Sequence, residues 1–362
     1  MLVRKAEGRG GRTGSEHGRT LAFGHVPVLN PAALAASDAS FDVVGIGNAL
    51  VDVIAQADDE FLAGEELHKG SMALIDTERA VHLYQAATIA VEMSGGSAAN
   101  TMCGVASFGG RAAYIGKVSD DDLGQLFGHD LLAVGVRFRA GSPDPEVPTG
   151  RCIIFVTPDA ERTMNTYLGV SSLLVPEDLD EAAIAQGKIL YMEGYLFDRD
   201  GAKAAFRRAA EVAHQAGRLV SLTLSDSFCV DRHRDDFRSL VRHSVDLLFG
   251  NELELCALYE VDSFDDAVAA LRADDCMGAI TRGATGSVVV THDEVIAVPA
   301  VPVGQVVDTT GAGDLYAAGF LYGVTQGHDF ATAAHYGSIA ASEVISHVGP
   351  RPLTELSRYL AD

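Results

Sequence analysis

The segment best suited to chemistry is Asp-Thr-Thr-Gly-Ala-Gly-Asp at residues 308–314, which opens a run of small and apolar residues with helical spacing. Gly311, Ala312 and Gly313 are small enough for a phosphate group to approach the backbone closely. The free N–H groups and the dipole of a helix start favour negative charge. Asp314, in the first turn, is therefore predicted to be an ionised carboxylate that accepts a proton from an attacking hydroxyl. Taken alone, the pattern fits an ordinary glycine-rich turn equally well.

A second segment, Ser-Gly-Gly-Ser-Ala-Ala-Asn at residues 94–100, lies between an apolar run and an expected helix. Gly95 and Gly96 permit a ligand to approach the backbone closely. Asn100 offers both a donor and an acceptor, which suits vicinal hydroxyls. The alternative is a strand-to-helix turn with an asparagine cap.

A third segment, Gly-Ile-Gly-Asn-Ala-Leu-Val-Asp at residues 45–52, is similar to a dinucleotide-binding pattern but lacks its third glycine. An acidic residue normally follows that pattern after about twenty residues, whereas here it follows almost at once. We therefore reject a nicotinamide site. Asn48 and Asp52 are instead predicted to lie at the carboxyl end of a first strand and to contact a polyhydroxylated ligand.

The fourth segment, Asn-Glu-Leu-Glu at residues 251–254, directly follows an apolar run. Asn251 and Glu254 are suited to hold hydrated Mg²⁺ near phosphate groups. The alternative is a capped, acidic helix start. The sequence has no Walker A lysine pattern, which excludes a P-loop enzyme.

These segments need a scaffold that brings them together, and the hydrophobic pattern predicts one. From Phe41 onward, short apolar runs alternate with helical segments, which indicates βαβ units and an α/β fold with a mainly parallel, buried sheet. Strands are expected at residues 42–47, 88–93, 112–115, 189–192, 219–224, 246–249 and 279–281, and helices at 99–108, 121–134, 202–215 and 265–271.

Two regions, residues 69–75 and 150–167, have strand character without accompanying helices. In the second, Pro-Asp-Ala-Glu at 158–161 is a good turn between two strands. A hairpin inside an α/β chain is either a flap over a ligand site or an ordinary edge hairpin, and the pattern leaves both open.

The composition restricts the class of protein. The 362 residues are 48% hydrophobic and 21% charged, as expected of a soluble globular protein, and the net charge of −23 argues against nucleic-acid binding. No apolar run is long enough to cross a membrane. The five cysteines form no CxxC pair, so we expect free thiols and a cytoplasmic location, without a zinc site or disulfides. Residues 1–40 mix glycine with basic residues and are expected to be a disordered extension; a basic interaction arm is the alternative.

Together and in this order, the four segments resemble those of the PfkB (ribokinase-like) family of carbohydrate and nucleoside kinases. The resemblance covers residues 41–362 and implies a three-layer α/β/α sandwich with a mainly parallel central sheet. It also implies a small β lid over the acceptor pocket, for which the segments near 53–75 and 137–167 are the candidates. The family includes monomers and homodimers joined through the lid.

The same resemblance implies roles for individual residues. Asp314 would be the catalytic base that serves the acceptor hydroxyl, and the amides of residues 311–313 would stabilise the transferred phosphoryl group. ATP would be the donor, with Mg²⁺ held by Glu254 through water, and Asp308 and Thr310 match ligands of an activating K⁺. The residues that would meet ATP are Asn251, Thr281, Arg282, Gly283, Ala284 and Gly286.

The acceptor is less sharply defined. Asn48 with Asp52 resembles the first-strand motif of adenosine kinases, and Arg162, Met164 and Thr166 resemble an adenosine-kinase lid strand. Glu193 instead matches a glutamate that contacts the free sugar in ribokinases. We expect a purine nucleoside, adenosine first, phosphorylated at the 5′-hydroxyl. The alternatives are a free ketose or pentose, and an inactive protein that binds nucleotide or sugar and regulates a partner.

Overall fold

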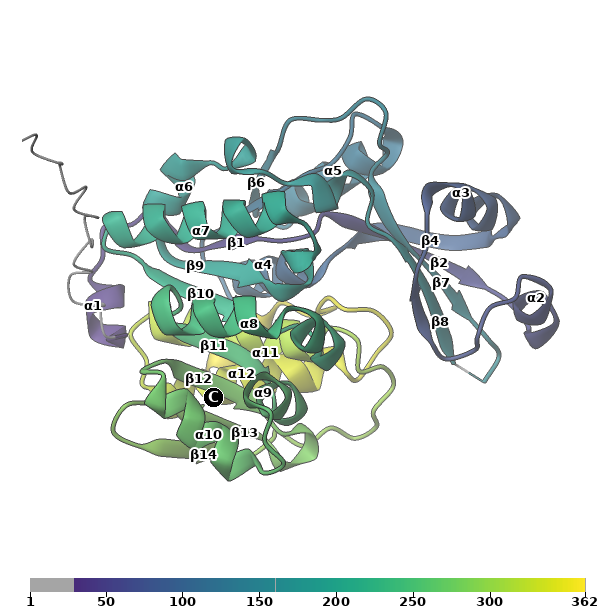
Figure 1. Ribbon diagram of the computed structural model, residues 1–362. Helices are drawn as coiled ribbons and strands as arrows, with labels where there is room; N and C mark the ends of the chain where they lie inside the picture. Colours follow the sequence, from purple (N-terminus) through teal and green to yellow (C-terminus); the bar gives the residue numbers. More distant parts are fainter. Residues whose placement is uncertain (1–28, 160, 362) are drawn as a thin grey trace, which may run out of the picture.

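The computed structural model describes residues 29–159 and 161–361. Within them, nine strands form a central sheet in the order β14-β13-β12-β11-β10-β9-β1-β5-β6 (Figure 1). Their bounds are β1 Phe41–Ile46, β5 Ala112–Gly116, β6 Arg137–Ala140, β9 Gly187–Glu193, β10 Leu219–Thr223, β11 Leu247–Asn251, β12 Met277–Thr281, β13 Ser287–Val290 and β14 Val295–Val298. Neighbours from β6 to β12 pair in parallel, and only β13 and β14 run antiparallel. The sheet is therefore mainly parallel, as predicted.

Helices cover both faces of this sheet. Side chains of β1 alternate between the two cores, with Val43 in one and Val44 and Ile46 in the other. The first core is closed by α4 Ser97–Ser107, α5 Asp122–Ala133, α11 Ala312–Thr325 and α12 Phe330–Val344. The second is closed by α6 Glu181–Ala185, α7 Asp200–Gln215, α8 Ser227–His243, α9 Glu252–Tyr259 and α10 Phe264–Ala273. This arrangement is the three-layer α/β/α sandwich that the family resemblance implied.

A second sheet projects from the sandwich (Figure 1, right) and is called the lid below. Its strand order is β3-β8-β7-β2-β4, with bounds β2 Leu50–Gln56, β3 Met72–Leu74, β4 Thr88–Gly95, β7 Gly150–Val156 and β8 Arg162–Tyr167. The hairpin expected at 150–167 is thus β7 and β8. α2 Asp59–Gly64 and α3 Thr77–Ala86 cover one face, where Val53, Leu62, Leu83 and Phe155 are buried.

The strand expected at residues 88–93 exists, but it does not join the central sheet. As β4 it pairs antiparallel with β2 in the lid. Conversely, β6 lies within the segment expected to contribute to the lid, yet it pairs with β5 at the edge of the central sheet. Apolar content identifies a strand but not its partners, because pairing depends on contacts distant in sequence.

Folded structure begins before Phe41. Residues 1–28 of the expected extension lie outside the described residues. Pro31–Ala35 form the short helix α1, which Asn30 caps through its side chain. Leu29 and Ala39 are buried.

Several shorter expectations can also be compared with the structure. All five cysteines are free thiols. In the described part of the chain, no helix combines the length and apolarity that a membrane span requires. Turns of 3₁₀ helix connect other elements: η1 Gly169–Leu173, η2 Pro176–Asp178, η3 Gly194–Asp198, η4 Gly283–Thr285 and η5 Leu356–Ala361.

Candidate active site

A pocket of about 1490 Å³ lies between the lid and the carboxyl ends of the central strands. Small-molecule pockets usually measure roughly 300–1,000 Å³, so this one has room for two ligands side by side. Most of the residues singled out in the sequence line it: Asn48, Asp52, Gly96, Asn100, Met164, Thr166, Glu193, Asn251, Glu254, Thr281, Arg282, Gly283, Thr310, Gly311, Ala312, Gly313 and Asp314. The fold therefore brings all four sequence segments to one cavity.

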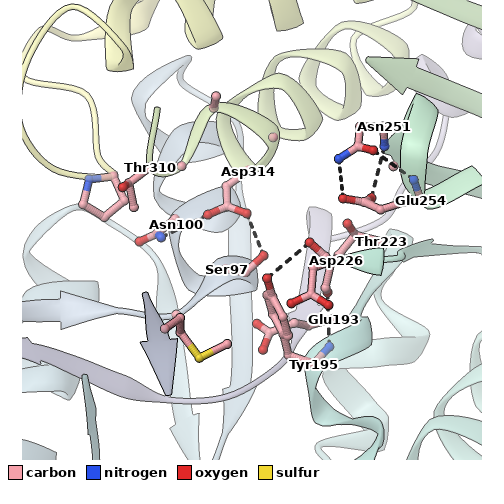
Figure 2. Close-up of a pocket in the computed structure, with 18 of the residues that line it drawn as sticks. Ser97, Asn100, Glu193, Tyr195, Thr223, Asp226, Asn251, Glu254, Thr310 and Asp314 are labelled. Carbon is pink, nitrogen blue, oxygen red and sulfur yellow. Dashed lines mark hydrogen bonds between the residues drawn. The ribbon is translucent and has the colours of Figure 1, made fainter. Parts of the chain in front are cut away.

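Asp314 stands at the centre of this pocket, in the first turn of α11 (Figure 2). Its Oδ1 accepts a hydrogen bond of 2.6 Å from Ser97 Oγ, and its Oδ2 accepts one of 3.1 Å from Asn100 Nδ2. Both donors lie on α4, directly after the glycine pair. Asn100 therefore donates a hydrogen bond to the Asp314 carboxylate, a role that the sequence had not predicted beside its contact with a ligand hydroxyl.

The charge on Asp314 depends on its burial. Burial raises the pKa of Asp314 to about 6, against the hydrogen bonds from Ser97 and Asn100, which lower it. The sequence predicted that this carboxylate stays ionised, but in the free protein that holds only above about pH 6. A carboxylate with a pKa near 6 is a better proton acceptor at neutral pH than an ordinary aspartate.

The glycine-rich turn before Asp314 has the geometry of an anion-binding helix start. Gly311 is the N-cap of α11 with φ of +80°, a conformation that favours glycine. A Cβ there would lie 2.7 Å from the carbonyl oxygen of Pro350. Gly313 faces open space, since a Cβ at this position would meet nothing within 4 Å. Ala312 N–H donates to Thr309 O, while Leu315 N–H makes the first helical bond, to Gly311 O.

The glycine pair makes room for other parts of the protein. A Cβ at Gly95 would lie 2.5 Å from the Asp52 carboxylate, and a Cβ at Gly96 would overlap the backbone carbonyl of Asn48. Gly96 also has φ of +92°. These two positions let the lid strand β4 and the start of α4 close around Asp52 and Asn48.

Asp52 lies on β2 in the lid, and not at the end of the first central strand as expected. No side-chain or backbone donor in residues 29–159 and 161–361 hydrogen-bonds its carboxylate, which faces the pocket. Burial raises the pKa of Asp52 to about 6, while the charges of Arg351 and Arg162 lower it. Asp52 is therefore an acceptor available to ligand hydroxyls.

Glu193, at the end of β9, is already engaged by the chain itself. Its Oε1 accepts from Asn48 N and Nδ2 at 3.2 and 2.9 Å, and its Oε2 accepts from Ala98 N at 2.8 Å. Asn48 Oδ1 in turn accepts from Ser171 Oγ at 3.1 Å. Burial raises the pKa of Glu193 to about 7. In this structure Glu193 fixes Asn48 and the start of α4; a sugar contact stays a prediction.

Asn251 and Glu254 form the capping box that was the alternative interpretation of their segment. Glu254 N–H donates to Asn251 Oδ1 at 2.9 Å, and Asn251 N–H donates back to Glu254 Oε2 at 3.1 Å. Both also line the pocket, opposite Asp314 in Figure 2. Burial raises the pKa of Glu254 to about 7, and the nearby charge of Asp226 adds to it.

A hydrated cation fits this corner of the pocket better than a directly coordinated one. The described residues contain no group of three or more His, Cys, Asp or Glu side chains that could hold a metal ion. In the same part of the chain, the hydrogen bonds of Glu254 include no basic partner, so its charge is uncompensated there. Mg²⁺ keeps several waters in kinase sites and uses one or two carboxylates with phosphate oxygens, which matches these donors.

The segment expected to meet ATP is only partly at the pocket. Thr281, Arg282 and Gly283 line it, whereas Ala284 and Gly286 do not. Gly286 has φ of +107° and packs against the backbone at the end of β14. A glycine is therefore needed at this position for the turn between β12 and β13. The Arg282 guanidinium pairs with Glu252 and stacks on a phenylalanine ring.

Asp308 has its carboxylate satisfied by protein donors. Oδ1 accepts from Thr310 Oγ1 at 2.7 Å, Oδ2 accepts from Gly349 N at 2.9 Å, and Arg162 Nη2 lies 3.0 Å from Oδ2. The lid strand β8 is thus linked to the anion-binding turn by an ion pair. Neither Arg162 nor Asp308 lines the pocket directly, nor does Gly95. K⁺ activation stays a prediction.

Sequence reasoning missed several residues of the site. Ser97 could have been found, because it follows the glycine pair at the helix start. Thr223 is the last residue of β10, Asp226 follows that strand, and both line the pocket (Figure 2); their position at the end of a strand was the available signal. Tyr195 and Arg351 carry no local pattern that points to function.

Comparisons with known proteins identify the family of this chain. The family model described as pfkB family carbohydrate kinase matches residues 72–356. The structure of adenosine kinase from Sinorhizobium meliloti is 51% identical, with a TM-score of 0.82 and coverage of 89% of this chain and 99% of that one. A probable sugar kinase protein from Rhizobium etli CFN 42 is 47% identical, with a TM-score of 0.82 and coverage of 89% and 98%. Adenosine kinase from Saccharomyces cerevisiae is 25% identical over 88% of this chain and 98% of its own length.

Proposed function

The chain belongs to the pfkB family of carbohydrate kinases, phosphotransferases that act on hydroxyl groups, and we propose that this member phosphorylates the 5′-hydroxyl of a purine nucleoside, adenosine first, with ATP as donor. The coarser activity, a carbohydrate or nucleoside kinase, follows from the family. The choice of a purine nucleoside as acceptor depends on the lid side chains that line the pocket.

Two cross-strand rows of side chains form that face. Strand register places Asp52 beside Cys152, Cys152 beside Thr166, and Thr166 beside Leu74. A second row on the same strands consists of Ile154, Met164 and Met72, with Met164 paired to both of the others. Because side chains alternate along a strand, both rows face the pocket while their neighbours are buried against α2 and α3.

This lid face supports an acceptor that is polar at one end and apolar at the other. Asp52 provides a carboxylate for vicinal hydroxyls, and the row of Ile154, Met164 and Met72 provides an apolar wall. Met72 and Leu74 are 49% and 53% exposed, so the wall has apolar surface left to cover. A nucleobase would bury that surface, at roughly 25 cal/mol per Å², whereas a free sugar would leave it in water.

The proposed transfer is supported by groups that lie together in the pocket. Asp314 takes the proton of the acceptor hydroxyl as the oxygen bonds to the γ-phosphorus and the bond to the ADP oxygen breaks. The helix start at Gly311–Gly313 stabilises charge on the transferred group. Mg²⁺, held through water by Glu254, would supply charge neutralisation to the phosphates.

A free ketose or pentose is the second candidate, because Glu193 lines the pocket and a probable sugar kinase is similar over 89% of the chain. An inactive binding protein is the third. It is disfavoured because Asp314 and the turn before it are complete and lie in an open pocket.

A panel of acceptors tests the proposal. Purified protein is given ATP and Mg²⁺ with adenosine, inosine, ribose or fructose, and ADP release is followed. Adenosine-dependent release without release for the free sugars is expected. Release with ribose or fructose alone would favour the sugar kinase, and no acceptor-dependent release would favour the binding protein.

A lid variant sharpens the choice. Met164→Ala removes part of the apolar wall and is expected to raise KM for adenosine at least about tenfold, since burying such a side chain contributes roughly 1.5–3 kcal/mol. Val295→Ala, on an exposed side chain of β14 far from the pocket, is the matched control. An unchanged KM in Met164→Ala would contradict the proposal that the nucleobase of the acceptor packs against the lid.

A further inference from the structure

The loop that follows α12 carries the residues of this inference, Gly349, Pro350 and Arg351. Gly349 N–H donates to Asp308 Oδ2 at 2.9 Å, and Pro350 packs against Gly311. Arg351 contacts the segment at residues 94–100, through Ser94 before the glycine pair and Asn100 in the helix after it. One short loop therefore joins the anion-binding turn to the segment that hydrogen-bonds Asp314.

Arg351 makes two directed hydrogen bonds. Its Nη1 donates to Ser94 Oγ at 2.6 Å, and its Nε donates to Asn100 Oδ1 at 3.2 Å. On its other side Asn100 donates through Nδ2 to Asp314 Oδ2 at 3.1 Å. The three groups form a chain from guanidinium to amide to carboxylate.

The guanidinium decides which way the Asn100 amide points. A flipped amide has nearly the same shape, so packing distinguishes the two orientations poorly. After a flip, the amide NH₂ would face the guanidinium N–H groups and the amide oxygen would face the Asp314 carboxylate. Both contacts would then be repulsive, because arginine has no acceptor and an ionised carboxylate has no donor.

Asp314 has few other favourable partners. It faces Asp52 from β2, Glu193 and Tyr191 from β9, and Tyr195 from η3, all acidic or neutral. Its hydrogen-bond donors in the described part of the chain are Ser97 and Asn100. The orientation of Asn100 therefore controls one of the two bonds that favour the ionised base.

We propose that Arg351 is a positioning residue for phosphoryl transfer: it locks the Asn100 amide so that Nδ2 donates to Asp314 and holds the base ionised and aligned. The inference rests on the proposed role of Asp314 as base. It predicts that Arg351 acts on the chemical step through Asn100.

The same guanidinium also acts on the acceptor side. Among nearby charges, Arg351 is the one that lowers the pKa of Asp52 most. Its Nη2 is buried and has no hydrogen-bond partner within residues 29–159 and 161–361. Arg351 therefore also favours the charged form of Asp52, the second carboxylate that would face the acceptor.

A double-mutant cycle in the full-length protein tests the inference. R351A, N100A and the double variant are compared by kcat and KM as a function of pH, with adenosine as acceptor. We expect R351A to lower kcat about tenfold or more and to move the acidic limb of the kcat profile to higher pH. In the N100A background it should have little further effect on kcat. Added guanidinium should partly restore R351A.

Controls separate this role from general damage. Arg358→Ala, exposed on η5 in the same C-terminal segment and paired with Glu355, should keep the wild-type profile. If R351A does not fold, R351K replaces it in the cycle, because lysine keeps the charge but cannot bond Ser94 and Asn100 as a planar fork. Losses that add up, or an acidic limb that does not move, would overturn the role of Arg351. A D314N variant with wild-type turnover would instead refute the base assignment itself.

Discussion

Replacing Asp314 by asparagine tests the chemistry and the electrostatics of the pocket together. The side chain keeps its size but loses the charge and the ability to take a proton. If Asp314 is the base, kcat should fall at least about 100-fold, the lower end of what general bases contribute. KM for the acceptor should change far less, because Asp52 and the lid are untouched.

The same substitution should stabilise the protein above neutral pH. Burial raises the pKa of Asp314 from 3.8 to about 6. Between these values the folded protein holds a proton that the unfolded chain has released, so the free energy of unfolding falls as pH rises through this window. At about 1.4 kcal/mol per pKa unit, the ionised carboxylate costs the folded state up to about 3 kcal/mol. Access to water in the open pocket lowers this to about 1–3 kcal/mol.

Two measurements and one control test both the role of Asp314 as base and the effect of its charge on stability. ADP release with adenosine gives kcat. Urea unfolding at about pH 5, within the pKa window, and at about pH 8, above it, gives the stability difference, which should be larger at the higher pH. The control is Asp329→Asn at the N-cap of α12, where backbone and side-chain hydrogen bonds from Thr332 lower the pKa of Asp329. It should keep turnover and gain no stability, since asparagine caps a helix as well as aspartate. Turnover near wild type in D314N would refute the base, and a stability gain that is absent at the higher pH would refute the electrostatic reasoning.

Four further predictions concern the surroundings of this carboxylate. Ser97→Ala removes a donor to Asp314, and the acidic limb of the kcat profile should move up by about one pH unit from about 6; an unmoved limb contradicts this. Gly95→Ala places a Cβ 2.5 Å from the Asp52 carboxylate and should raise KM for the acceptor, whereas Gly109→Ala, with nothing within 4 Å, should leave KM unchanged and cost only the strain of its φ of +94°, about 1 kcal/mol by urea unfolding. Glu254→Gln should raise the Mg²⁺ concentration needed for half-maximal turnover about tenfold, and equal Mg²⁺ titrations for variant and wild type would argue against the cation site. Turnover measured in potassium-free buffer should rise on adding K⁺ if Asp308 and Thr310 bind it, and an unchanged rate removes that hypothesis.

The local geometry of the main motif and the type of sheet could be predicted from the sequence. A run of small residues that opens a helix carries its own backbone geometry, so the turn at 311–313 and Asp314 could be predicted from the sequence without the fold. The alternation of apolar runs with helices likewise predicted the parallel central sheet. Both are short-range patterns, set by backbone sterics and by which face of an element is buried.

The contacts of these residues depend on segments that come together only in the folded protein. Ser97 and Arg351 lie 217 residues before Asp314 and 251 residues after Asn100, respectively, and no local pattern joins them. The burial that raises the pKa of Asp314, the pairing of β4 with the lid, and the use of Glu193 to fix Asn48 all depend on chain segments that meet only after folding. Periodicity can identify an element, but contacts across the fold determine which strands pair, which charges are desolvated and which donors hold the base.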